Sequence, residues 1–175
     1  MQDKLSFRLA TISDKKLIQQ WWTKPHVVKF WDNSSDMWKN AENYLHGKKD
    51  LFDYWIGSLN SYAFSLLLTS EFEKNLPLDN PYATWIDQHG KTMSIDFLIG
   101  EENFLGKGYG RTTLMEFSQL LKTEYDATEL IIDPAISNTK AVKTYQSAGF
   151  NIVDTFTRHS GYFAGVKHYL MVLKL

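Results

Sequence analysis

Hydrophobic and polar residues alternate over residues 5–11 (LSFRLAT), and this period of two is typical of a half-buried β-strand. A helical pattern follows at residues 13–22, with Ser13 as the expected N-cap and an acidic residue in the first turn. Pro25 then ends that helix. The chain therefore begins with a strand and a short amphipathic helix.

The next part of the chain predicts one more helix and a hairpin. Residues 34–47 begin with serines and end with glycine, which favours a helix. Residues 53–70 favour two strands that join at residues 59–61. Residues 71–90 carry charges and prolines without a period, so we expect a long surface loop of the kind that often carries function.

Strands and helices alternate in the second half, which together with the strand-rich first half predicts an α/β (α+β) fold with a mixed sheet. A helix over residues 108–123 has an apolar face, and a helix over residues 138–148 stops at Gly149. The remaining predicted elements are strands at residues 92–100, 128–133, 150–158 and 168–175.

Composition narrows the class of protein. The chain has 175 residues, 43% hydrophobic and 22% charged, which suits a single folded domain over residues 1–175. A net charge of -1 gives no general attraction to nucleic acid, and the absence of cysteine excludes disulfides, thiolate catalysis and cysteine-bound metals. No apolar run approaches the roughly 20 residues that span a bilayer. We expect a cytoplasmic protein without nucleic-acid, membrane or metal partners, as a monomer or homodimer.

Three glycines at alternate positions, Gly106, Gly108 and Gly110, separate a predicted strand from a helix. Backbone N–H groups at a glycine-rich helix N-terminus can surround an anion, and Lys107 and Arg111 add positive charge. The spacing matches neither a P-loop nor a dinucleotide fingerprint. On these residues alone, a tight turn with solvated lysine is about as good an explanation as a phosphate site.

The second half resembles the GCN5-related N-acetyltransferase (GNAT) superfamily. Residues 105–110 (LGKGYG) fit its phosphate loop, Q/R-x-x-G-x-G/A, except that Leu105 replaces Gln or Arg. Residues 131–150 (IIDPAISNTKAVKTYQSAGF) fit its second signature. The segments SIDFLI, LGKGYG and HVVKFW further resemble the aminoglycoside 6′-N-acetyltransferases. The chain departs from that group at residues 59–62 and 71–91, and the second of these segments contributes to the acceptor pocket in relatives.

The resemblance implies a GNAT fold, with a mostly antiparallel twisted sheet of six to seven strands and about four helices. It also implies acetyl-CoA as the acetyl donor and direct transfer to a primary amine of an aminoglycoside-like small molecule. Other acceptors remain open, namely a siderophore precursor or a peptide N-terminus, as does a non-catalytic acyl-CoA-binding module. The residues expected to hold acetyl-CoA are Phe97, Leu98, Ile99, Leu105, Gly106, Lys107, Gly108, Tyr109, Gly110, Arg111 and Asn138.

Asp96 is a lone carboxylate in an apolar strand, where burial would raise its pKa into a useful range for a general base. A partner for a buried Arg or Lys is an equally good explanation from spacing alone, and the resemblance favours the base. Asp133, at the end of the next strand, is expected to bind an ammonium of the acceptor, or else to be a turn residue before Pro134. By resemblance, Tyr145 would donate a proton to the departing thiolate.

Aromatic side chains are candidates for stacking against a sugar ring of the acceptor. Trp31 is our main candidate and Trp85, in the long loop, is a second one. Most tryptophans of the first two helices are expected to lie in the core instead.

Overall fold

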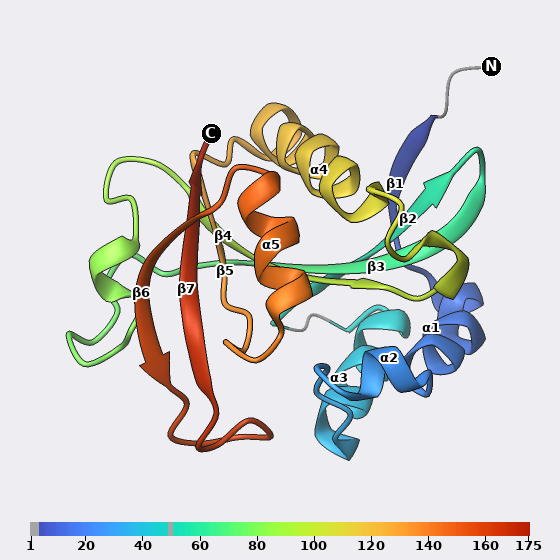
Figure 1. Cartoon of the computed structure of the whole chain (residues 1–175), viewed down its shortest axis with the longest axis horizontal. Helices are drawn as coiled ribbons and strands as arrows, with labels where there is room; N and C mark the ends of the chain where they lie inside the picture. The colour runs from blue at the N-terminus through green and yellow to red at the C-terminus, as the bar shows by residue number, and fades with distance from the viewer. Residues whose placement is uncertain (1–3, 49–50) are drawn as a thin grey trace. The chain divides into compact units, whose positions relative to one another are not determined.

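The computed structural model describes residues 4–48 and 51–175, and the chain forms a mixed, mostly antiparallel sheet with helices, as predicted (Figure 1). The seven strands follow the order β1-β2-β3-β4-β5-β7-β6. β4 and β5 pair in parallel, whereas β1–β2, β2–β3, β5–β7 and β6–β7 pair antiparallel. The strands are β1 (Leu5–Leu9), β2 (Asp53–Leu59), β3 (Tyr62–Glu71), β4 (Thr92–Ile99), β5 (Glu129–Ile132), β6 (Asn151–Thr157) and β7 (Lys167–Lys174).

The predicted elements are largely confirmed, with corrected bounds. The helices of the described residues are η1 (Ile12–Asp14), α1 (Lys15–Trp22), α2 (Pro25–Val28), α3 (Ser35–Leu45), η2 (Ala83–Trp85), η3 (Glu102–Phe104), α4 (Tyr109–Tyr125) and α5 (Thr139–Ser147). Pro25 does end the first helix, but it also opens a new one as its first residue. The long loop predicted at residues 71–90 contains a short helical turn, η2.

The chain divides into two compact units, which we describe separately. The first unit comprises Met1–Thr69 and Phe97–Gly110, and the second comprises Ser70–Asp96 and Arg111–Leu175. In the first unit, an apolar cluster joins the helices α1, α2 and α3 to β2 and β3. Its buried members are Ala10, Ile18, Trp21, Trp22, Val27, Ala41, Leu45, Tyr54, Ile56, Leu66, Leu68 and Leu98.

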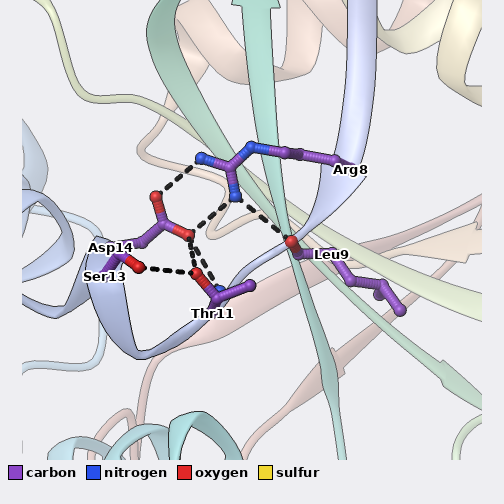
Figure 2. Close-up of polar contacts among 5 residues, drawn as sticks. All are labelled: Arg8, Leu9, Thr11, Ser13 and Asp14. Atoms are coloured by element: carbon purple, nitrogen blue, oxygen red, sulfur yellow. Dashed lines mark hydrogen bonds and ion pairs between the residues drawn. The ribbon is translucent and has the colours of Figure 1, made fainter.

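A charged pair fixes the corner between β1 and α1 (Figure 2). Both terminal nitrogens of Arg8 donate to the Asp14 carboxylate, each at 2.7 Å, and Thr11 N donates to Asp14 Oδ2 at 2.8 Å. The Arg8 hydrogen bond holds the pKa of the Asp14 carboxyl below its usual range. The prediction of Ser13 as N-cap is therefore wrong. Ser13 lies inside η1, which Thr11 caps through a capping box with Asp14, and Asp14 is itself the N-cap of α1.

In the second unit, β5 lies between β4 and β7, and α5 lies next in the chain. Its cap is as the sequence suggests, since the Asn138 side chain accepts a hydrogen bond from Ala141 N, and Gly149 adopts a φ of 103° after the helix. The parallel pairing of β4 with β5 ends at the Ser94–Ile131 pair. Asp96 and Asp133 therefore come just beyond the paired part of two neighbouring strands. No helix of the described residues is long and apolar enough to span a membrane.

Candidate active site

The glycine loop of the first unit leads directly into α4. Gly106 and Gly108 have φ values of 71° and 86°, the left-handed region that glycine adopts without strain. A Cβ on either would meet no atom within 4 Å, so the need for glycine at these positions is conformational. Residues 105–108 are exposed and lead into the N-terminus of α4, the end of a helix at which backbone N–H groups are directed outward. This geometry suits a phosphate.

The segment between β4 and this loop is held by α1 and α2. The N–H groups of Gly100 and Glu101 both donate to the Phe64 carbonyl, at 2.8 and 3.2 Å, which is the two-against-one arrangement of a β-bulge. Glu101 accepts hydrogen bonds from Trp21 Nε1 at 2.7 Å and from Lys24 Nζ at 3.1 Å. The approach to the phosphate loop is therefore fixed by charged and aromatic side chains from the first helices.

His26 also contacts this strand. Its Nε2 lies 2.8 Å from the carbonyl oxygen of Ile99. Phe97, Leu98 and Ile99 are among the residues expected to hold acetyl-CoA, and the Ile99 carbonyl is already engaged by this ring. His26 thus positions the predicted cofactor strand, a role that the sequence did not indicate.

Asp96 is partly buried at the end of the second unit's portion of β4. Burial raises its pKa to about 7, the neighbouring Asp133 carboxylate contributes in the same direction, and Arg158 opposes both. No described residue forms a hydrogen bond or an ion pair with the Asp96 carboxylate, and Arg158 acts on it only through its charge. A carboxylate that titrates near neutral pH can act as a general base.

Asp133 is the carboxylate that carries the structural partners. Its Oδ2 accepts a hydrogen bond from Tyr82 Oη at 2.9 Å and pairs with Arg158 Nη2. The His168 ring lies beside it, with Nδ1 2.6 Å from the Asp133 carbonyl oxygen. The Asp133 side chain is therefore engaged by residues of its own unit, and both predicted roles, ammonium binding and the turn before Pro134, stay predictions.

Aromatic rings surround these polar groups. The Tyr82 ring lies 5.1 Å from that of Phe72 and 5.5 Å from that of Phe156, measured between centroids. The Phe156 ring also stacks on His168, at 5.7 Å. This aromatic packing orients the Tyr82 and His168 side chains that contact Asp133.

Tyr145, on α5, is buried, and burial raises the pKa of its hydroxyl, with Asp96 and then Asp133 adding to the shift. The hydroxyl therefore lies within electrostatic range of both carboxylates and stays protonated at neutral pH. Asp96, Asp133, Tyr145, Tyr82 and Arg158 form one group in the second unit, which we call the carboxylate cluster.

The other predicted residues lie in varied settings. Trp31 is partly buried against the core of the first unit, with its ring 6.3 Å from that of Trp22. Trp85 packs against the apolar cluster that contains Ile131 and Leu170. Arg111 is exposed, and its Nε donates to the Ser147 carbonyl at 2.9 Å. Asp96 and Tyr145, the two catalytic candidates, thus lie within electrostatic range of Asp133. Trp31 and Trp85, the two stacking candidates, instead pack against apolar clusters.

The sequence model of the family described as "Acetyltransferase (GNAT) domain" matches residues 11–158 of the chain. The chain belongs to the GNAT acetyltransferase family. A curated relative, the aminoglycoside N(6′)-acetyltransferase type 1 of Klebsiella pneumoniae, is 25% identical over 165 residues, which are 91% of this chain and 80% of the relative. The N-acetyltransferase activity predicted from the sequence is thereby confirmed.

Solved structures agree with the GNAT fold. The aminoglycoside N(6′)-acetyltransferase of Legionella pneumophila superposes with a TM-score of 0.81 at 28% identity, over 99% of this chain and 94% of that one. The enzyme AAC(6′)-Ib, in complex with coenzyme A and kanamycin, superposes with a TM-score of 0.77 at 22% identity, over 98% of this chain and 95% of that one.

Three residues of this GNAT chain's site were missed by sequence reasoning. Tyr82 lies in a segment without a period, Arg158 follows a strand and has no motif around it, and His168 lies within the predicted strand at residues 168–175. All three reach Asp133 from segments distant in sequence. A pairing of this kind leaves no local signal.

Proposed function

We propose that this GNAT acetyltransferase is one domain that moves the acetyl group of acetyl-CoA directly to a primary amine of an aminoglycoside-like small molecule. The observation that carries the proposal is Asp96, a carboxylate with a pKa of about 7 on the strand that continues into the predicted pantetheine segment and the phosphate loop. The relatives named for aminoglycoside acetylation support the class of acceptor.

The donor is expected to bind along the segment that follows Asp96. Backbone groups of Phe97, Leu98 and Ile99 would bind pantetheine, the loop at residues 105–111 would bind the pyrophosphate, and Asn138 would line the cofactor. The positive φ values of Gly106 and Gly108 and the exposure of the loop fit such an anion. Lys107 and Arg111 would add charge.

The acceptor amine has to lose protons before and during the acetyl transfer. An alkylamine has a pKa near ~10.4, so at pH 7 only about one in a few thousand is neutral and able to attack. The acceptor ammonium first passes one proton to the Asp96 carboxylate. The neutral nitrogen then forms a bond to the thioester carbon, and the C–S bond breaks. Tyr145 gives its hydroxyl proton to the departing thiolate and receives the second proton that the nitrogen loses, while Asp133 binds another ammonium of the acceptor.

The test is release of free thiol from acetyl-CoA with kanamycin, tobramycin and simple amines as acceptors. Turnover that depends on an aminoglycoside, with acetylated product seen by mass spectrometry, supports the proposal. Turnover only with simple amines or peptide N-termini would contradict the acceptor class. Binding of coenzyme A in calorimetry without turnover on any amine would contradict the enzyme, and would indicate an acyl-CoA-binding module.

A further inference from the structure

Asp133 is the residue proposed to bind an ammonium of the acceptor, yet one of its carboxylate oxygens is already in contact with a cation of this chain. Arg158 Nη2 pairs with Asp133 Oδ2, and the same oxygen accepts the Tyr82 hydroxyl. The charge of Asp133 is therefore cancelled within the carboxylate cluster. An incoming ammonium finds little net attraction there while the guanidinium stays in place.

The Arg158–Asp133 contact is made end-on, through one guanidinium nitrogen. Nε of Arg158 is buried, and no described residue accepts a hydrogen bond from it. Nη2 is shared with Tyr82 Oη, at a longer 3.4 Å. A bidentate pair would be both stronger and more specific. This one leaves part of the guanidinium's capacity unused, so an acceptor's ammonium can compete with it for the carboxylate.

The Arg158 side chain is partly exposed and can move away from Asp133 toward solvent. Its side chain is 37% exposed, whereas that of Asp133 is 13% exposed. Its backbone is fixed by hydrogen bonds of Arg158 N to the Val166 carbonyl and of Gly165 N to the Arg158 carbonyl. The guanidinium also lies over the Phe156 ring, at 5.8 Å. Side-chain rotation alone can therefore release Asp133 while the backbone keeps its position.

We infer that Arg158 competes with the acceptor's ammonium for Asp133, and so determines how strongly the site discriminates against acceptors with several ammonium groups. This inference rests on the proposed function and adds a specificity-determining residue to it. An acceptor with a single amine needs no second cation subsite, so its binding is insensitive to Arg158. A polyammonium acceptor has to share the Asp133 carboxylate with the guanidinium or displace it.

The experiment compares two acceptors that share the reacting aminomethyl sugar group but differ in charge, kanamycin and methyl 6-amino-6-deoxyglucoside. The variants are Arg158→Gln and Arg158→Met, which remove the charge in a polar and an apolar way. Arg158→Lys retains it. Lys167→Gln removes an exposed charge from β7 as the matched control. Arg158 also acts on the pKa of Asp96, and that effect is common to both acceptors. The readout is therefore the KM for kanamycin divided by the KM for the single-amine sugar, both measured with the same variant.

Removal of the Arg158 charge should lower the ratio of the KM for kanamycin to the KM for the single-amine sugar about tenfold. A change of this size corresponds to the loss of one hydrogen bond to a charged group. Arg158→Lys and Lys167→Gln should leave the ratio near that of the wild type. An unchanged ratio in both neutral variants, or a higher relative KM for kanamycin, would overturn the inference alone. If the wild type binds acetyl-CoA but acetylates neither acceptor, the proposed function fails and the inference fails with it.

Discussion

A Cβ atom on Gly100 would lie 2.2 Å from the Cγ and Cδ2 atoms of the Trp21 ring. Trp21 is fully buried and is held by a hydrogen bond from its Nε1 to Glu101, so the ring has no space to withdraw. The close approach of α1 to the end of β4 therefore depends on the absence of a side chain at position 100.

We expect Gly100→Ala to lower the free energy of unfolding by about 1–3 kcal/mol, the usual cost of an overpacked core. Urea denaturation measures it. Gly106→Ala is the comparison, because its added methyl group meets no atom within 4 Å and any loss there comes from the φ of 71°, so Trp21→Phe should not recover it. A double variant with Trp21→Phe should recover part of the loss, and strict additivity of the two changes would contradict the steric explanation.

Asp96→Asn should reduce kcat about a hundredfold, within the range of general-base contributions. In the wild type, activity should rise with pH through about 7, since Asp96 has to lose its proton before it can accept one from the acceptor. That limb of the pH profile should disappear in the variant. Asp154→Asn, an exposed carboxylate on β6, should leave the profile unchanged. Persistence of the limb in Asp96→Asn would assign it to another group.

The same pKa shift predicts how stability depends on pH. The folded protein holds the Asp96 proton up to a pKa of about 7, whereas the unfolded chain releases it near 3.8. The carboxylate therefore destabilises the fold progressively as pH rises between these values. Relative to wild type, Asp96→Asn should gain 1 kcal/mol or more at pH 8, at about 1.4 kcal/mol per pKa unit, and little at pH 4. Equal stabilities at both pH values in urea denaturation would contradict a raised pKa.

Asp14 should behave in the opposite way. Its pKa is lowered by Arg8, so its contribution is fully present above the ordinary carboxyl pKa and is lost as pH falls through the lowered value. Asp14→Asn should cost about 1.5–3 kcal/mol at pH 7, as expected for hydrogen bonds to a charged group. The difference from wild type should shrink toward pH 3. A cost that does not change with pH would show that the charge is unimportant.

Tyr145→Phe removes the proposed proton donor while it retains the buried ring. We expect kcat to fall at least tenfold and KM for acetyl-CoA to change little, because the hydroxyl acts on the departing thiolate. The raised pKa of Tyr145 keeps its hydroxyl protonated at neutral pH, so the loss should be constant between pH 6 and 9. A rise in KM with kcat unchanged would instead make Tyr145 a binding residue.

The sequence predicted the parts of this protein that depend on local chemistry. The alternation at residues 5–11, the glycines before α4 and the Asn138 cap each leave a signal within a few residues. It failed where contacts are distant in sequence. Ser13 is a good N-cap by type, but the N-cap of α1 is Asp14, which Arg8 of the preceding strand holds by two hydrogen bonds. Arg158 and Tyr82 likewise become recognisable only once the fold brings them to Asp133.

Tyr82 belongs to the segment before η2, and its hydroxyl donates to the carboxylate proposed to bind the acceptor. The same segment is where the chain departs from the acetyltransferases that it resembles. A change in this one connection would therefore alter a contact of Asp133 without touching the strand that carries Asp96 or the glycine loop before α4.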